Sequence, residues 1–477
     1  MKWHKIIVSV LFLAVAFLTA CSDDDVFTTS SSYKLAFSES VVNLDTIFSK
    51  TPSSTHAFWV YNTSGKSLRC TNVRLENGNQ TGFRVNVDGT YLGQEMGYQV
   101  QDVEIHAGDS IRVFVELTSP ENGAAGPQKV TDNLVFKLES GVEQKVELSA
   151  WSWDAVCVRG LVIDKDSVIS TKKPLVVYDG ITVAEEACLT LSAGTNIYFH
   201  ENAGIVVKGS LKALGEAGKE VVLRGDRLDK MFDYLPYDLV SGQWQGLHFG
   251  TTSYDNVLQF TDIHSTYDGI VCDSSDVEKE KISIEQSTIH NCQGYGLLLN
   301  NVKGHIYNSQ ITNVLNDCVC VNGGDVKING CTLAQFYPFD SARGAALRFS
   351  SVYALLGLKV MNSIITGYAD DVLMGVKTDT EKVFNYAFSD CIIRTPKIET
   401  EDSVYFTNVV YENVNNTSSN GEKHFKLISA DTQHYDFHLA KESEAIAKGN
   451  AETIPTVDRE GRKRGVKPCI GAFEYVE

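Results

Sequence analysis

The segment MFDYLPYDLVSGQW, residues 231–244, carries four aromatic side chains between two stretches typical of β-strands, VVLRGD and WQGLHFG. The four are Phe232, Tyr234, Tyr237 and Trp244. Tyr and Trp combine a flat apolar face with a polar tip, which suits stacking on a sugar ring. The same loop could instead fold back over neighbouring strands or against another domain, and packing is the more common role of such loops. The four aromatics are therefore candidates for glycan contact.

His264 and His290 each follow an isoleucine of a repeating pattern by one residue. If these isoleucines stack on successive turns of a coil, both imidazoles lie on neighbouring turns within contact distance. A histidine pair on a sheet could perform acid–base chemistry or bind a metal ion. No carboxylate recurs beside the pair, and the eleven cysteines show no CxxC spacing. An exposed polar column is the favoured interpretation, so the sequence predicts no metal site and no cofactor.

A repeated pattern predicts the element that positions these side chains. Each unit ends on an apolar residue, with a small residue two positions earlier and another apolar residue five positions earlier. The final apolar residues are Ile263, Ile289, Ile311, Leu333, Ile365 and Ile393. A spacing of 22 residues in the middle of this series fits a parallel β-helix, in which equivalent apolar residues stack inside the coil. Asn291, Asn313 and Gln335 follow three of these residues and predict an amide ladder at a turn.

Two stretches resemble a known family. GITVAEEACLTLSAGTNIYFHENAGIVVKGSLKALGEAGKEVVLRGD, residues 180–226, is similar to the opening turns of right-handed parallel β-helix proteins with the pectate-lyase-like fold. The C-terminal residues resemble the closing segment of bacterial β-helix surface proteins. The matching positions are Ser443, Ala445, Ile446, Gly449, Asp458, Gly461, Arg462 or Arg464, Ile470, Gly471, Ala472, Phe473 and Glu474. Cys469 stands where that family usually has aspartate. The resemblance implies a right-handed parallel β-helix over residues 158–435 and a closing segment over residues 436–477.

This fold is shared by lyases, hydrolases, adhesins and inert stalks, so the resemblance implies architecture more than activity. Lyases of the family use a basic residue to abstract a proton, for which Arg343, Arg348 and Lys359 are the candidates. Related hydrolases use clustered aspartates, for which Asp370 and Asp371 are the candidates, but their further aspartates are missing. We therefore expect a non-catalytic recognition or display role, with polysaccharide the expected ligand. A polysaccharide lyase or glycoside hydrolase, and a structural stalk, are the alternatives.

The region before the repeats, residues 33–150, consists of short alternating strands separated by turns such as NTSGKS. Such spacing predicts a sandwich of about seven strands. It resembles the immunoglobulin-like modules of bacterial surface proteins, which usually act as spacers. The expected fold class is thus all-β, an immunoglobulin-like sandwich followed by a right-handed parallel β-helix.

The chain begins with the basic stretch MKWHK and the apolar run Ile6–Leu18, which is shorter than the roughly 20 residues that span a bilayer. The run ends at LTAC, which resembles the lipobox of bacterial lipoproteins, and Asp23, Asp24 and Asp25 resemble the acidic export tag of surface lipoproteins in Bacteroidetes-type bacteria. The resemblance implies a signal peptide over residues 1–20, a lipid on Cys21, an acidic and Ser-rich tether over residues 21–32, and an outer-membrane location facing the cell exterior. The membrane is then a partner through the lipid anchor.

The overall charge bears on the partners of the chain. The formal net charge of the chain is −18, which argues against nucleic acid as a partner. The oligomeric state is left open by the sequence.

Overall fold

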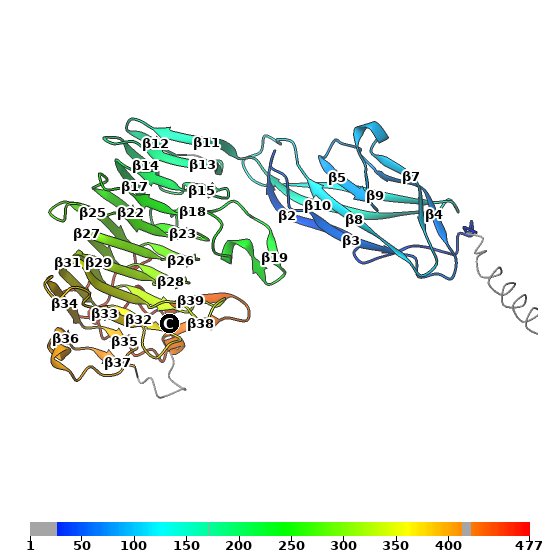
Figure 1. Cartoon of the computed structure of the whole chain (residues 1–477). Coiled ribbons are helices and arrows are strands. Elements are labelled where there is room, and N and C mark those ends of the chain that lie inside the picture. Colours follow the sequence, from blue (N-terminus) through cyan, green and yellow to red (C-terminus); the bar gives the residue numbers. More distant parts are fainter. Residues whose placement is uncertain (1–25, 171, 413–420) are drawn as a thin grey trace, which may run out of the picture. The chain divides into compact units, whose positions relative to one another are not determined.

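The computed structural model describes residues 26–170, 172–412 and 421–477, and these residues form mainly β-structure (Figure 1). The chain divides between Asp154 and Ala155 into two compact units, called here the first and the second unit. The helical elements assigned in the described residues are short 3-10 helices: η1 (Gln94–Met96), η2 (Tyr237–Leu239), η3 (Glu401–Tyr405) and η5 (Gly421–His424). None of the described helices has the length and hydropathy needed to span a bilayer. The predicted signal peptide and Cys21 lie outside the described residues.

The first unit is a sandwich of two five-stranded sheets. One sheet has the order β1 (Ala36–Phe37), β3 (His56–Tyr61), β8 (Ser110–Leu117), β5 (Phe83–Val87) and β6 (Thr90–Tyr91). The other has the order β2 (Val41–Phe48), β10 (Glu143–Trp153), β9 (Gln128–Leu138), β4 (Leu68–Leu75) and β7 (Gln99–Ile105). Alternate residues of both sheets are buried in one shared core, as period-two strands require. The predicted sandwich is confirmed, with ten short strands where about seven are expected.

The second unit consists of short strands, of which 25 form one continuous parallel sheet that coils on itself. In chain order the strands of this unit are β11 (Val156–Ile163), β12 (Ser167–Ile169), β13 (Leu175–Val183), β14 (Cys188–Ser192), β15 (Asn196–Phe199), β16 (Ile205–Val207), β17 (Ser210–Leu214), β18 (Val221–Gly225), β19 (Lys230–Phe232), β20 (Leu235–Pro236), β21 (Leu247–Phe249), β22 (Asn256–Gln259), β23 (Thr261–His264), β24 (Ile270–Cys272), β25 (Glu280–Glu285), β26 (Thr288–Cys292), β27 (Leu297–Tyr307), β28 (Gln310–Val314), β29 (Val319–Asn329), β30 (Thr332–Gln335), β31 (Leu347–Met361), β32 (Ile364–Gly367), β33 (Leu373–Val376), β34 (Phe384–Ser389), β35 (Ile392–Ile393), β36 (Phe406–Thr407), β37 (Val410–Tyr411), β38 (Phe425–Ser429) and β39 (His434–Leu439). This arrangement is the parallel β-helix that the repeat predicts.

Three faces of this coil are named here by the strands that stack on them. Sheet A contains β16, β21 and β24, the first halves of β27, β29 and β31, and β33. Sheet B contains β14, β17, β22 and β25, the second halves of the same three long strands, and β34 and β36. Sheet C contains β15, β18, β23, β26, β28, β30, β32, β35 and β37.

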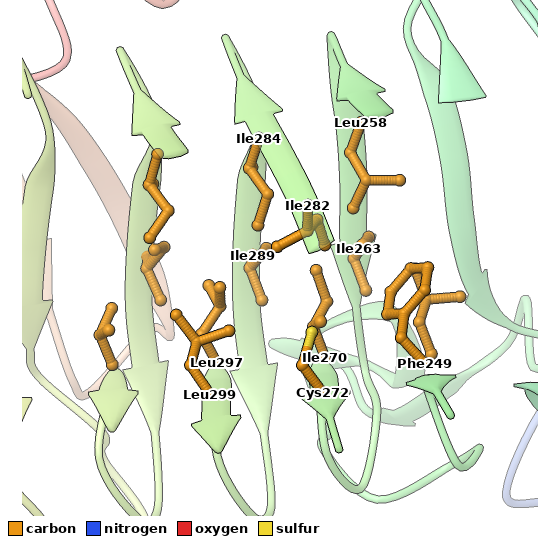
Figure 2. Packing of buried hydrophobic residues seen from close by; sticks show 14 of the residues in the cluster. Phe249, Leu258, Ile263, Ile270, Cys272, Ile282, Ile284, Ile289, Leu297 and Leu299 are labelled. Carbon is orange, nitrogen blue, oxygen red and sulfur yellow. The ribbon is translucent and has the colours of Figure 1, made fainter. Parts of the chain in front are cut away.

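The apolar residues of the repeat stack inside the coil in the predicted register. Ile263 pairs with Ile289, which pairs with Ile311, and the column continues to the end of the series. All six final residues are fully buried. Figure 2 shows Ile263 and Ile289 inside the coil together with Leu258 and Ile284, which lie five residues before them. Each such side chain contributes roughly 1.5–3 kcal/mol of burial free energy.

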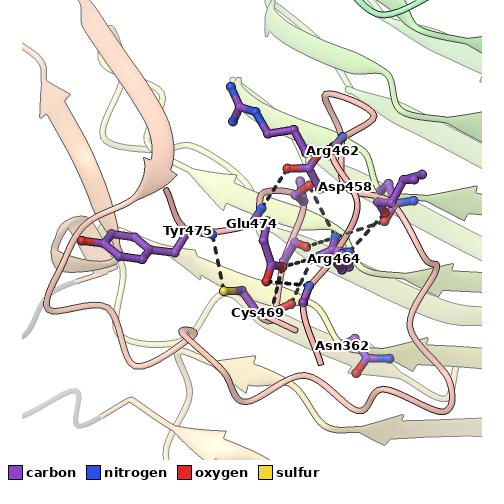
Figure 3. A network of polar contacts seen from close by, with 12 residues as sticks. Asn362, Asp458, Arg462, Arg464, Cys469, Glu474 and Tyr475 are labelled. Carbon is purple, nitrogen blue, oxygen red and sulfur yellow. Dashed lines mark hydrogen bonds and ion pairs between the residues drawn. The ribbon is translucent and has the colours of Figure 1, made fainter. Parts of the chain in front are cut away.

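The closing segment lies on the outer face of sheet C and is fixed there by a buried arginine (Figure 3). Arg464 donates to the carbonyl oxygens of Cys469 (3.1 Å) and Gly471 (2.8 Å), and it forms an ion pair with Glu474 at 3.3 Å. Asp458 accepts from the backbone N–H of Glu474 at 3.0 Å. The sulfur of Cys469 accepts from the backbone N–H of Tyr475 at 3.4 Å, so it occupies an acceptor position that an aspartate could also fill. The D-x-x-G-x-x-R and G-A-F-E patterns therefore have a structural role.

Candidate functional site

Two histidines and two aspartates meet on the outer face of sheet C. The register pairs His264 of β23 with His290 of β26, and their rings stack with centroids 4.7 Å apart. The prediction that the two imidazoles contact each other is confirmed. Asp262 lies two residues before His264, and successive strand residues alternate between faces, so both point outward while Ile263 points into the coil.

The carboxylate of Asp262 contacts both imidazoles. Its Oδ1 lies 2.8 Å from Nδ1 of His264 and 3.3 Å from Nε2 of His290. Nε2 of His264 lies 2.8 Å from Oδ1 of Asp238, which in turn lies 2.7 Å from Nη1 of Arg224. These five residues, Arg224, Asp238, Asp262, His264 and His290, are called here the early cluster. The interpretation of His264 as part of an exposed column is wrong, because only 6% of the residue is exposed.

Charge within the early cluster is compensated. Burial alone would lower the pKa of His264, but the charges and hydrogen bonds of Asp262 and Asp238 outweigh burial and raise it to about 9. Burial opposes ionisation of Asp238 as well, and His264 and Arg224 nonetheless lower its pKa to about 2. The pKa of Asp262 is held well below its usual range by the two histidines, against the effect of burial. Both carboxylates are therefore ionised at neutral pH and already neutralised by neighbouring cations.

Three residues of the early cluster, Arg224, Asp238 and Asp262, were not identified as candidates from the sequence. Asp262 had an available signal, because the spacing D-x-H within a strand places both side chains on one face. Asp238 had none, because it belongs to η2 in the segment between β18 and β21, whose path follows no repeat. His264 and Asp238 are 26 residues apart in the sequence. Tertiary folding alone brings them together.

A groove of about 240 Å³ adjoins the early cluster at His290. Leu239 and residues of the β38–β39 hairpin contribute to its lining. The lining residues are Leu239, His290, Asn291, Gln310, Thr312, Asn313, Gln433, His434, Tyr435 and Phe437. Among the described residues, neither Oδ1 of Asn313 nor the hydroxyl of Tyr435 has a hydrogen-bond partner, although both atoms are buried. The predicted amide ladder is therefore not formed through Oδ1 of Asn313.

The aromatic segment divides into an exposed part and a buried part. Phe232 and Tyr234 are 55% and 56% exposed, and their rings stack with centroids 5.7 Å apart. Tyr237 lies under the guanidinium of Arg227, which is 3.7 Å from its ring centroid. Trp244 is fully buried, so it is a core residue and not a glycan contact. Its ring stacks on Phe199 with centroids 4.2 Å apart, and its Nε1 donates to the carbonyl of His264 at 2.8 Å.

The basic candidates do not converge. Nη1 of Arg343 donates to the carbonyl oxygens of Tyr337 (3.1 Å) and Asp340 (3.0 Å) within the loop after β30. Arg348 lies on sheet A, and its Nε is 2.8 Å from Oδ2 of buried Asp317. Lys359 lies on sheet B, exposed, beside Lys327. Arg348 and Lys359 thus belong to different faces of the coil.

The acidic candidates are exposed and have backbone and hydroxyl partners. Oδ1 of Asp371 accepts from the backbone N–H of Leu373 at 3.2 Å and from the hydroxyl of Thr395 at 3.1 Å. Among the described residues, neither Asp370 nor Asp371 contacts a further carboxylate that would complete an acid–base pair. Their geometry is that of a turn before β33.

A second hollow of about 410 Å³ lies over sheet A. Its lining includes Gly246, where a side chain is excluded because an added Cβ would lie 1.7 Å from the carbonyl oxygen of Asp268. His248, also in the lining, pairs with Asp273 at 3.0 Å, and both side chains are about half exposed (48% and 40%). This hollow is larger than the groove, but its charged lining residues have separate partners: Asp179 pairs with Arg159, and Asp268 accepts from the backbone N–H of Tyr295. We therefore place the candidate site at the early cluster and its groove.

Comparisons with known proteins match the fold only. No family model and no curated protein sequence matches the chain. Among solved structures, the catalytic domain of a GH87 α-1,3-glucanase in complex with nigerose aligns with 80% of this chain and 93% of its own, at 10% identity and a TM-score of 0.30. The catalytic unit of the GH87 α-1,3-glucanase from Streptomyces thermodiastaticus aligns with 74% and 88%, at 12% identity and a TM-score of 0.26. Scores this low carry no argument about activity, and the strand pairing itself establishes the β-helix of this chain.

Proposed function

We propose that the second unit binds a polysaccharide on the outer face of sheet C. The observation that carries this proposal is the exposed, parallel stack of Phe232 and Tyr234 on the segment whose Leu239 lines the groove. The exposed faces of the two rings are in contact with water, and a sugar ring stacked on them would remove this apolar surface from water, which is favourable.

The chemistry of the groove favours a neutral polysaccharide. Gln310, Thr312 and Asn313 contribute amides and a hydroxyl to its lining, and such groups both donate to and accept from sugar hydroxyls. The cations of the early cluster are compensated by Asp238 and Asp262, so they offer no surplus positive charge to a uronate. The formal net charge of −18 disfavours a polyanion further.

Cleavage of the bound polysaccharide is a second candidate function, and one observation favours it. Asp262 holds Nε2 of His290 at 3.3 Å, while His290 lines the groove. A carboxylate that orients an imidazole is the arrangement of a general base. Against a two-carboxylate glycosidase mechanism, His264 fills the space between Asp238 and Asp262, so no water or glycosidic oxygen can lie between them.

The experiment that tests binding uses residues 22–477, which include all described residues, against a panel of neutral and uronate polysaccharides in affinity electrophoresis and calorimetry. We expect binding to a neutral polysaccharide, weakened about 5- to 150-fold by the double change Phe232→Ala and Tyr234→Ala, since each stacked ring contributes about 0.5–1.5 kcal/mol. Tyr91→Ala is the matched control, because Tyr91 is 51% exposed and belongs to the first unit.

The outcomes separate the alternatives. Binding that survives the double change, or a preference for uronates, would contradict the proposal. New reducing or unsaturated ends that disappear in His290→Ala would establish cleavage as a glycoside hydrolase or lyase. Absence of both binding and turnover would leave the structural stalk.

The proposal extends to location. We propose that a lipid on Cys21 anchors the chain to the outer membrane, facing the exterior, which is supported by the LTAC sequence at Leu18–Cys21. Two or more acyl chains anchor a protein stably, since each buried CH₂ contributes about 0.8 kcal/mol. Incorporation of labelled palmitate in the expressing bacterium, abolished by Cys21→Ser, is the expected result. Equal labelling of the variant would contradict it.

A further inference from the structure

Three side-chain atoms of the early cluster converge in the way that ligands converge on one ion. Asp262, His264 and His290 each offer one ligand atom, and these atoms lie within 4.8 Å of one another. Oδ1 of Asp262 is 2.8 Å from Nδ1 of His264 and 3.3 Å from Nε2 of His290. Two ligands bound to zinc at about 2.0–2.2 Å lie about 2.8–3.6 Å from each other at octahedral or tetrahedral angles. The two distances from Oδ1 of Asp262 fall within this range.

From this geometry we infer that Asp262, His264 and His290 form a binding site for a divalent transition-metal ion of the zinc class. Two imidazoles and one carboxylate suit zinc, cobalt or nickel better than calcium or magnesium, which prefer oxygen ligands alone. The strands that carry the three residues, β23 and β26, are adjacent in sheet C, so the backbone already holds the site in place.

The groups around His264 match the surroundings of a metal-bound histidine. Such a histidine almost always donates its second ring N–H to a carboxylate or carbonyl, which fixes its tautomer. Here Nε2 of His264 contacts Asp238 at 2.8 Å, and Arg224 holds Asp238 at 2.7 Å. With the proton on Nε2, the lone pair of Nδ1 faces Asp262. A bound ion takes the position of the proton that otherwise bridges His264 and Asp262, and that proton is released.

The site is open on one side. The side chain of His290 is 21% exposed and lines the groove, whereas that of His264 is 7% exposed. Three protein ligands with an open side are typical of zinc sites that bind a water molecule or a substrate atom. Arg459, whose Nε donates to Thr288 at 2.7 Å, adds positive charge nearby. We therefore expect micromolar affinity and not the tighter binding of a closed structural site.

The inference is independent of the polysaccharide proposal, and its test uses metal ions alone. Metal-free residues 22–477 are titrated with ZnCl₂ by calorimetry and with CoCl₂ by visible absorption, in parallel with thermal unfolding. We expect one ion per chain, a Co²⁺ spectrum with nitrogen ligation, and a raised melting temperature with Zn²⁺. His290→Ala should abolish all three responses. Asp238→Asn, which alters only the partner of His264, should weaken binding about 10–100-fold.

Controls keep the result specific to this site. His248→Ala removes the exposed His248–Asp273 pair of sheet A and should bind metal as the wild type does. His290 is partly exposed, so its replacement is expected to fold, and an unchanged circular dichroism spectrum in EDTA verifies this. Absence of stoichiometric binding to the wild type, or equal binding by His290→Ala, would overturn the inference. Polysaccharide binding measured in EDTA tests the other proposal separately.

Discussion

An early and a late histidine–carboxylate cluster on the outer face of sheet C differ in what surrounds them. The early cluster lies on β18, β23 and β26 and on η2, which carries Asp238. The late cluster contains Thr366 of β32, Arg394, Glu412, His424 and Ser443. In the late cluster Glu412 lies 2.6 Å from His424 and 3.7 Å from Arg394, and all three are at least nine-tenths buried. There His424 is held by Glu412 and Ser443, Glu412 also contacts Thr366 and Arg394, and none of these residues lines the groove or the hollow over sheet A.

The difference shows how the same chemistry serves two purposes. In the late turns, the closing segment covers apolar residues of sheet C, including Ile364 and Ile392, and His424 of the Glu412 pair contacts Ser443 of that segment. In the early turns, the sheet keeps polar residues outward, and His290 borders the groove. A buried ion pair that is fully enclosed serves packing, whereas one with an open histidine can meet a ligand.

The largest effect is expected in the late cluster. Glu412→Ala leaves Arg394 and His424 buried without their carboxylate, so the free energy of unfolding should fall by about 3–5 kcal/mol. Urea denaturation measures this loss. Glu399→Ala is the matched control, because the ion pair of Glu399 with Lys397 is largely exposed and its loss should change stability by less than about 0.5 kcal/mol. Equal free energies of unfolding for the two variants would show that the late cluster does not stabilise the fold.

A smaller loss of stability is expected on replacing Trp244, the core residue that contacts the early cluster. Trp244→Phe retains an aromatic ring on Phe199 but removes the N–H that donates to the buried carbonyl of His264. An unsatisfied buried acceptor costs about 1–3 kcal/mol. We expect a loss of stability in this range, together with weaker Zn²⁺ binding. Trp151→Phe, at a residue 46% exposed, should change neither quantity. Unchanged metal binding in Trp244→Phe would show that the core does not position the cluster.

The coil itself could be predicted because its residues obey a period. Ile263, Ile289 and Ile311 recur at spacings that only stacked turns explain, and the contact of His264 with His290 follows from that register. The candidate site could be predicted only in part. Asp238 contacts His264 from the segment between β18 and β21, which lies outside the repeating pattern. No spacing in the sequence therefore predicts the position of its side chain.

Closeness in the sequence is also a poor guide to spatial proximity where one long strand contributes to two faces of the coil. Arg348 and Lys359 both belong to β31, which contributes its first half to sheet A and its second half to sheet B. A cluster inferred from closeness along such a strand is divided by the corner of the coil. Trp244 is one of the four aromatic candidates for glycan contact, with packing over neighbouring strands the favoured interpretation, and its place just before β21 directs it into the core.

The smallest effect concerns two aspartates of the segment between β18 and β21. Asp238, in η2 of this segment, has a pKa lowered to about 2 despite burial, because His264 and Arg224 favour the charged form. Asp226, at its start, has a raised pKa, because burial outweighs its contact with His200 at 2.7 Å. A carboxyl whose folded pKa exceeds its unfolded value of about 3.9 costs stability once pH rises above that value.

Asp226→Asn removes this cost, although it also weakens the contact with His200. We therefore expect the variant to gain less than about 1 kcal/mol relative to the wild type on going from pH 3.5 to pH 7, as measured by urea denaturation at both values. Asp233→Asn, at an exposed residue of the same segment, should show no pH-dependent difference. A wild type that instead gains stability over Asp226→Asn as pH rises would show that His200 dominates over burial. Asp226 and Asp238 would then both be stabilised by an ion pair with a histidine, and only the open side of His290 would distinguish the early cluster.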